Sequence, residues 1–171
     1  MAIKGLTQTS SVVSIGFNAT ELGPNTFAQT SVDLNLSPLD REVVVVLAVN
    51  LDPFTPDSVA GTTTLVASSL TTTSQTAVQE ISESNCLARS NTVIRMNAAS
   101  VDGAAFSTIG IETPPATLEF IGIIATNDFF VQIEGTDNLT PKQVNGKLYG
   151  FRARADASIF AALVQSEVLS A

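Results

Sequence analysis

The sequence predicts an all-β protein: an antiparallel two-sheet β-sandwich, jelly-roll-like, with about nine or ten strands. Short segments in which apolar and polar side chains alternate recur along the chain, and turn-forming Pro, Gly, Asn and Asp residues separate them. No long helical pattern appears before residue 157. The length suits one domain with a sizeable core, and we expect that single domain to span residues 1–171.

The first half of the chain contains the clearest strand patterns. Residues 31–36, SVDLNL, alternate apolar and polar side chains, which is typical of a strand with one buried face. Residues 42–51, EVVVVLAVNL, form a continuous apolar run, which indicates a strand that is covered on both faces. Residues 62–81 predict two strands with a bend near 70–73, and residues 82–91 predict a polar connector.

The second half predicts five more strands. Asp102-Gly103 is a hairpin signal between the first two of them, and Asn127-Asp128 predicts a tight connection between the next two. A Thr-Pro-Pro sequence at 113–115 ends the second strand. The five segments are TVIRMNA (92–98), AFSTIGIE (105–112), TLEFIGIIA (117–125), FFVQIEG (129–135) and KLYGFRARAD (147–156).

The two terminal segments are apolar enough to need burial. Residues 6–17 predict a strand, whereas residues 157–169 fit either a short helix or a strand. Segments 1–20 and 157–171 can each complete their own sandwich or act as an arm on a neighbouring subunit. We favour the first alternative for the N-terminus and leave both open for the C-terminus. A helix would place these residues on one face: Phe160, Leu163, Val164 and Val168.

The surface is expected to be rich in hydroxyl groups and poor in charge. Charged residues make up only 14% of the chain, against roughly 25% in ordinary soluble proteins. The stretch TTTLVASSLTTTSQTAVQEI, residues 62–81, is the clearest case, with one acidic and no basic side chain. Hydroxyl groups form hydrogen bonds readily and lose little entropy when immobilised. We therefore expect this exterior to lie against identical copies of the chain.

The charge balance argues against direct nucleic-acid binding. The net charge is −8 and the isoelectric point is about 4.3, whereas nucleic-acid affinity depends on Lys and Arg. The cationic residues near the C-terminus form the only local cluster. We interpret them as partners of nearby carboxylates or as a solvated strand edge, with a weak nucleic-acid patch as the minor alternative. They are Lys142, Lys147, Arg152 and Arg154.

No catalytic, cofactor-binding or metal-binding residue is predicted. The chain has no His, and its single cysteine, Cys86, is interpreted as a small buried hydrophobe. Its Phe residues are expected mostly in the core, and Tyr149 is the only Tyr, so sugar binding and glycoside hydrolysis rank below structural roles. Acidic loop residues lack the spacing of a calcium loop, although calcium at a subunit boundary stays open. They are Asp52, Asp57, Glu80, Glu83, Asp102, Asp128, Glu134 and Asp137.

Targeting and modification signals are weak. The N-terminus MAIKGLTQTSS lacks the apolar region of a signal peptide, and no apolar run has the length of a membrane-spanning helix. We therefore expect no membrane partner, and synthesis in the cytosol with either retention there or release by a route that needs no signal, such as cell lysis. Asn18-Ala19-Thr20 and Asn138-Leu139-Thr140 match the N-glycosylation pattern and are interpreted as chance matches.

The strand pattern resembles that of small β-sandwich structural proteins of viruses and phages. SVDLNL, EVVVVLAVNL, TVIRMNA, FSTIGIE, TLEFIGIIA and FFVQIEG, with Pro, Gly and Asn/Asp turns between them, are similar to strands of single jelly-roll capsid subunits. The stretch SPLDREVVVVLAVNLDPFTPDSVAGTTT looks like small virion proteins of marine viral type. The resemblance implies a structural subunit of a virion. A basic arm for genome packaging is missing, because MAIKGLTQTSS has only Lys4.

These observations predict a virion structural protein that is not an enzyme and uses no cofactor. We expect it to assemble with itself into a shell or tube, with other virion proteins as further partners. The alternative is a carbohydrate-binding or adhesin-like β-sandwich module, or a decoration protein of a larger particle. The residues Phe129, Phe130, Phe151 and Phe160 are expected to anchor either the core or a subunit junction.

Overall fold

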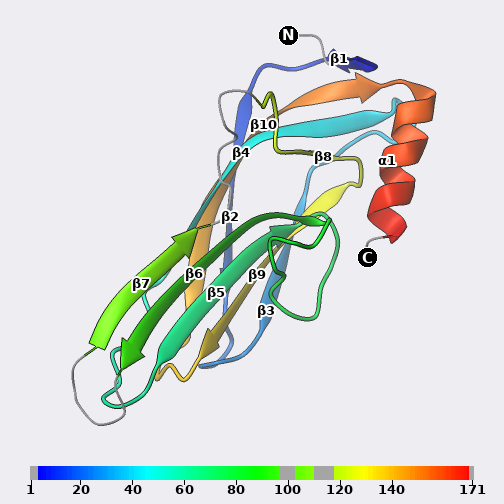
Figure 1. Ribbon diagram of the computed structural model, residues 1–171. Coiled ribbons are helices and arrows are strands. Elements are labelled where there is room, and N and C mark those ends of the chain that lie inside the picture. The colour runs from blue at the N-terminus through cyan, green and yellow to red at the C-terminus, as the bar shows by residue number, and fades with distance from the viewer. Residues whose placement is uncertain (1–3, 97–102, 110–117, 170–171) are drawn as a thin grey trace.

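The computed structural model describes residues 4–96, 103–109 and 118–169. In these residues the chain forms ten strands and one helix, and the strands make two antiparallel sheets that face each other (Figure 1). The predicted two-sheet sandwich is therefore confirmed. The elements are β1 Leu6–Gln8, β2 Val13–Thr20, β3 Ala28–Asp33, β4 Glu42–Pro53, β5 Thr64–Thr71, β6 Cys86–Met96, β7 Gly103–Ile109, β8 Gly122–Ile124, β9 Asp128–Thr136, β10 Gln143–Ala155 and α1 Ala157–Leu169.

The strand pairing has the nested order of a jelly roll. Sheet A contains β10 between β4 and the two N-terminal strands β1 and β2, with β8 on the far side of β4. Sheet B has the order β3-β9-β5-β6-β7. The pairs β2·β10, β3·β9, β4·β8 and β5·β6 nest inside one another, as in a long hairpin wound into two sheets. Strand β7 extends sheet B by one strand beyond these eight.

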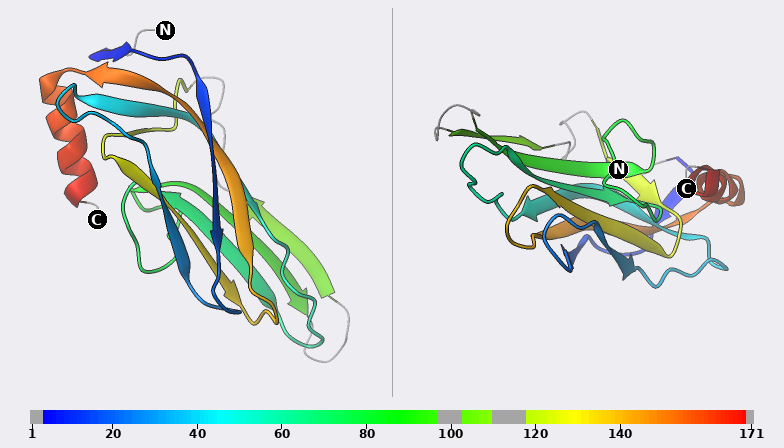
Figure 2. Two further views of the ribbon diagram at one scale, coloured as in Figure 1. Left: turned by 180° about the vertical axis from the view of Figure 1, so that it is seen from behind. Right: turned by 90° about the horizontal axis from the view of Figure 1, so that it is seen from below.

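The N-terminal segment lies on its own chain. Strand β2 pairs with β10 from Val13 opposite Gly150 to Thr20 opposite Gln143, and β1 continues along the same side of β10. Figure 2 shows this from behind, where the blue β2 runs beside the orange β10. The prediction of a strand at 6–17 is confirmed, with a break between Gln8 and Val13.

The core lies between the two sheets. Phe17 of sheet A and Phe129 of sheet B meet edge to face, with ring centroids 5.7 Å apart. Gly146 makes room for this contact, because a side chain there would overlap the ring of Phe17 and the carbonyl of Asn50. The fully buried side chains around this pair include Val46, Val66, Leu70, Ile124, Val131, Ile133, Val144 and Leu148.

Helix α1 resolves the ambiguity at the C-terminus. It packs on its own chain, over a second apolar cluster that includes Leu6, Val43 and Val45. Figure 1 shows it beside the sandwich, at the end opposite the loops that join β9 to β10. Three of the four expected face residues pack against the cluster, whereas Val168 is 63% exposed and Glu167 is buried instead. No helix of the described residues is long and apolar enough to span a membrane.

The stretch 62–81 differs from the prediction. Only Thr64–Thr71 is a strand, and the part of the chain from residue 72 to residue 85 is irregular. The polar connector predicted at 82–91 is also wrong, because β6 begins at Cys86. Strand β8 is shorter than the predicted 117–125, since only Gly122–Ile124 pair with β4. Asp102 of the expected hairpin and the residues 113–115 lie outside the described residues.

The hydroxyl groups of this stretch are mostly not on the exterior. Ser69 Oγ donates to Gln132 Oε1 at 2.8 Å, and Gln132 Nε2 donates to Thr71 Oγ1 at 2.7 Å. Residue 79 contributes its backbone N–H to Ser69 Oγ, so the irregular segment covers the outer face of sheet B. The expectation that these hydroxyls face other copies is therefore wrong for six residues, which are buried within this chain: Thr64, Ser68, Ser69, Thr71, Thr72 and Thr73.

Candidate functional site

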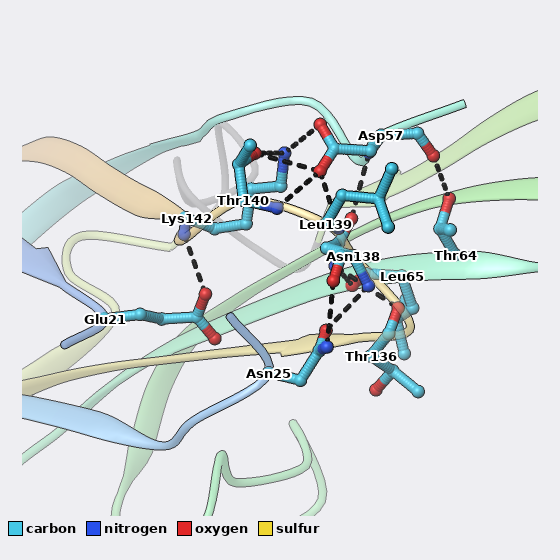
Figure 3. Close-up of polar contacts among 10 residues, drawn as sticks. All are labelled: Glu21, Asn25, Asp57, Thr64, Leu65, Thr136, Asn138, Leu139, Thr140 and Lys142. Carbon is cyan, nitrogen blue, oxygen red and sulfur yellow. Dashed lines mark hydrogen bonds and ion pairs between the residues drawn. The ribbon is translucent and has the colours of Figure 1, made fainter. Parts of the chain in front are cut away.

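Three loops meet at the end of the sandwich opposite α1, and polar side chains join them (Figure 3). The loops follow β2, β4 and β9, so residues far apart in the sequence are brought together. Strand pairing places the loops here because β2 and β4 both end beside the start of β10. We call this cluster the loop junction. Its side chains belong to Glu21, Asn25, Asp57, Asn138, Thr140 and Lys142.

Asp57 is the centre of the loop junction. Its Oδ1 lies 2.6 Å from Lys142 Nζ, and its Oδ2 accepts from the backbone N–H groups of Leu139 and Thr140 and from Thr140 Oγ1, each at 2.9 Å. The ammonium of Lys142, helped by the donors of residues 139 and 140, holds the pKa of Asp57 well below its ordinary value. Asp57 therefore stays ionised and cannot serve as a general acid or base near neutral pH.

Glu21 and Asn138 complete the loop junction. The buried Glu21 carboxylate accepts from the backbone N–H of Gly135 through Oε1 and from that of Lys142 through Oε2, both at 2.7 Å. Asn138 Nδ2 donates to the Leu65 carbonyl at 2.8 Å, and Asn138 Oδ1 accepts from Asp57 N at 2.9 Å. Since these polar groups are occupied by one another, the cluster holds the loops rigidly in place.

Three large apolar side chains stand on these fixed loops, and we call them the apolar tip. Leu22 follows Glu21 and is fully exposed at 101%. Leu139 is 71% exposed, although its own N–H is bonded to Asp57. Phe54 is 50% exposed, and its N–H donates to the Gln143 carbonyl at 2.8 Å. Large exposed apolar side chains on loops fixed in this way are candidates for contact with another protein.

A second exposed feature is the free side of β7. Among the described strands, β7 pairs only with β6, so its other side is an open sheet edge. Its sequence GAAFSTI contains no charged residue and no Pro, which are the usual guards of such an edge. Phe106, near its middle, is 53% exposed. Within the part of the chain that the structure describes, this edge is therefore available for pairing with another chain.

The cationic cluster predicted near the C-terminus is mostly paired within the chain. Three of its four members form ion pairs, which agrees with their interpretation as partners of nearby carboxylates. Lys147 is exposed and belongs to none of the ion pairs in the described residues. The three pairs are Lys142–Asp57 at 2.6 Å, Arg152–Glu42 at 3.2 Å and Arg154–Asp40 at 3.7 Å.

The acidic loop residues do not converge. In the parts of the chain that the structure describes, no three acidic or Cys side chains are grouped to hold a metal ion. Asp57 is used by Lys142, and Glu80 pairs with Arg89 at 3.0 Å. Asp102 lies outside the described residues.

The aromatic residues are less buried than the sequence predicted. Phe17 and Phe129 are core residues, whereas Phe54 and Phe106 are exposed and the remaining five are half-buried. Of the four Phe expected as anchors, Phe129 is in the core, Phe151 and Phe160 pack on the cluster under α1, and Phe130 is half-buried. Two of the nine Phe are therefore core residues, and three more, Phe120, Phe151 and Phe160, pack against a core cluster.

Cys86 agrees with its interpretation as a buried hydrophobe. Burial raises the pKa of its thiol to about 11, so the reactive thiolate is scarce at neutral pH. It borders an apolar hollow of about 360 Å³ between the irregular segment and the chain before β8. The hollow is lined by Ile81, Cys86, Leu87, Leu118, Phe120 and Ile121.

Comparisons with known proteins do not assign a family. No family model matches the chain, and no curated protein matches it. One similar solved structure is from Desmodium yellow mottle tymovirus, at 16% sequence identity and a TM-score of 0.31. The alignment covers 92% of this chain and 97% of the viral chain. At this TM-score it does not establish a shared fold.

Proposed function

We propose that this chain is a non-enzymatic virion structural protein that assembles with copies of itself into a shell or tube. In this role other virion proteins would be further partners, and the virion would be its location. The jelly-roll winding of the two sheets fits the proposal, since this architecture serves viral capsids as well as lectins and cupins. Fold alone does not determine function, so the surface of this chain has to carry the proposal.

The apolar tip is the feature that most directly supports self-assembly. A loop junction of buried, mutually bonded polar groups holds Leu22, Phe54 and Leu139 out into solvent. For a monomer this arrangement costs free energy, because apolar surface stays in water and the loops lose entropy. Both costs are offset when the side chains pack against a neighbour. The acidic side chains Asp52 and Asp137, both exposed near these loops, argue against an anionic membrane as that neighbour.

The free edge of β7 offers a second contact with a neighbouring copy, through strand pairing. A chain with two separate contact surfaces can join more than one copy at a time, so assembly can continue beyond a dimer. Individual contacts can be weak in such a lattice, since many of them act together.

The test is sedimentation and negative-stain microscopy of the purified chain at micromolar concentration. We expect large regular particles from the natural sequence. A variant with Leu22→Ser, Phe54→Ser and Leu139→Ser should remain folded and sediment as a small species. Leu39→Ser is the matched control, because Leu39 is 97% exposed on a loop outside the tip. A natural chain that stays monomeric across salt and calcium concentrations would refute the proposal. Unchanged particles from the triple variant would refute the role of the tip.

A further inference from the structure

The outer face of sheet A carries a hollow with a different character from the apolar tip. It has a volume of about 320 Å³, at the lower end of the ~300–1,000 Å³ of small-molecule sites. Strands β4 and β10 supply its walls, through side chains that point away from sheet B. We call it the Tyr149 hollow, and its lining residues are Asn50, Asp52, Asn145, Gly146, Lys147 and Tyr149.

The strand register explains why these residues gather. Inward-facing Leu148 of β10 and Val49 of β4 are fully or almost fully buried in the core, so their neighbours Lys147, Tyr149 and Asn50 point outward. Lys147 lies opposite Asn50 on one side and Gly16 on the other. Two residues further along β10 in each direction, Asn145 lies between Asp52 of β4 and Asn18 of β2, and Tyr149 lies between Ala48 of β4 and Ser14 of β2.

Small residues occupy the strand positions next to Lys147 and Tyr149. Gly16 of β2 has nothing within 4 Å of where its Cβ would lie, so the space over it is open. Ala48 and Ser14 flank Tyr149 with short side chains. The Tyr149 side chain, in a residue that is 37% exposed, is therefore accessible to a flat ligand.

The polar groups around this ring are available to a ligand. Within the described residues, the side chains of Asn50, Asp52, Lys147 and Tyr149 make no hydrogen bond or ion pair with the protein. The loop junction differs sharply, because its polar groups are bonded to one another. An amide offers both donors and an acceptor, a carboxylate offers acceptors, and an ammonium offers donors. Together they match the mixed donors and acceptors of adjacent hydroxyl groups.

We propose that the Tyr149 hollow binds a neutral saccharide, with one sugar ring stacked on Tyr149. The apolar face of a pyranose ring fits an aromatic side chain, and its hydroxyl edge would meet Asn50, Asp52 and Asn145. One carboxylate and one ammonium leave the site without net charge, which favours a neutral sugar over a charged one. The inference does not depend on self-assembly, and in a particle it requires this face of sheet A to be exposed.

The sequence provides a direct optical probe of this site. Tyr149 is the only tyrosine and the chain has no tryptophan, so its intrinsic fluorescence reports on the hollow alone. The experiment titrates the full chain with neutral oligosaccharides of glucose, galactose, mannose and N-acetylglucosamine. We expect a saturable fluorescence change with at least one of them. No saturable change with any neutral oligosaccharide, or a change only with sialylated oligosaccharides, would overturn the proposal.

Variants locate the binding by calorimetry with the oligosaccharide that responds. Tyr149→Ala should weaken binding at least tenfold, whereas Tyr149→Phe keeps the ring and should stay within about threefold. Gly16→Gln should also weaken binding at least tenfold, because Gly16 lies opposite Lys147 and a side chain there enters the open space beside the hollow. Phe106→Ala removes an exposed aromatic side chain from sheet B and should leave the affinity unchanged. Full affinity in both Tyr149→Ala and Gly16→Gln would show that the hollow is not the site.

Discussion

Asp57 and Lys142 join two loops that are 85 residues apart in the sequence. The Lys142 side chain is only 5% exposed, so its ammonium depends on this carboxylate and on Thr140 Oγ1 for compensation. A buried charge that loses its partner costs far more than a surface pair contributes. The stability of the loop junction is therefore concentrated in one contact.

Asp57→Asn should lower the free energy of unfolding by about 2 kcal/mol, because it leaves the Lys142 ammonium without a counter-charge. The natural chain should lose the same stabilisation in acid. Since the folded-state pKa of Asp57 lies below its unfolded value of 3.8, the contribution is present above that pH and is lost as the pH falls further. Urea titrations at neutral pH measure the effect of the substitution, and their extension from pH 4 to pH 3 follows the onset of the loss in acid. Asp40→Asn is the control, because the Asp40–Arg154 pair is exposed and should contribute little.

Thr71 shows how the hydroxyl groups of this chain are used. Its Oγ1 donates to the Thr73 carbonyl at 2.7 Å and accepts from Gln132 Nε2 at 2.7 Å, with both Thr71 and Gln132 fully buried. Thr71→Val keeps the shape of the side chain but removes both bonds. We expect a loss of about 1–3 kcal/mol in urea unfolding, the cost of leaving buried polar groups unpaired. The exposed Thr7→Val of β1 should change stability little, and an equal loss there would contradict this interpretation.

At the scale of elements, alternating apolar and polar side chains predicted the strands that have one buried face. This pattern failed at residues 72–85, where the composition matches a strand but the chain crosses the outer face of sheet B instead. Gln29 and Ser69 on that face accept hydrogen bonds from the backbone N–H groups of residues 75 and 79 in the crossing segment, so a neighbouring strand is not needed. A hydroxyl-rich segment can pair with a neighbouring strand, or it can cross the face of a sheet and form hydrogen bonds with side chains there. Composition cannot distinguish these two arrangements. The C-terminal segment was ambiguous for a related reason, since α1 is apolar on most of its surface.

Helix α1 is attached through a buried carboxylate as well as through apolar packing. Glu167 Oε1 and Oε2 accept from the backbone N–H groups of Ala125 and Thr126 at 2.8 and 2.9 Å. Burial nevertheless raises the pKa of Glu167 above its ordinary value of 4.5. The stabilisation linked to this group is therefore complete below pH 4.5 and is lost as the pH rises through the folded-state pKa.

We therefore expect α1 to be docked more firmly at pH 4 than at pH 7. Amide hydrogen exchange of residues 159–167, corrected for the intrinsic rate at each pH, should show greater protection at the lower pH. Glu167→Gln should remove this difference, whereas Glu83→Gln, at an exposed loop position, should preserve it. Firmer docking at pH 7 in the natural chain would contradict the assignment.

At the scale of the whole molecule, the winding of the two sheets was only partly predictable. The sequence shows where strands begin and end, but nothing in it says that β2 pairs with β10 or β3 with β9. The loop junction follows from that pairing. Asp57 was among the acidic loop residues and Lys142 among the cationic cluster, yet no signal in the sequence connected the two. The Tyr149 hollow was missed for the same reason, since its walls come from distant strands.

The net charge of −8 per chain should oppose self-assembly, because copies repel one another. Salt screens this repulsion over a Debye length that shrinks from ~8 Å at 0.15 M to ~3 Å at 1 M. Contacts made by Leu22, Phe54 and Leu139 depend little on screening. We therefore expect the protein concentration needed for assembly to fall as salt rises, as measured by light scattering. Dissociation in high salt would indicate ionic contacts between copies. It would contradict an interface formed by the apolar tip.

The burial of Asn138 has a practical consequence. Its side-chain nitrogen is bonded to the Leu65 carbonyl, so a glycan attached to this nitrogen before folding would prevent the loop junction from forming. Asn18, by contrast, is exposed on the face of sheet A beside Asn145. A glycan attached to Asn18 would be compatible with the fold and would lie on the face of sheet A that carries Tyr149. Material made in bacterial cytoplasm keeps that face bare.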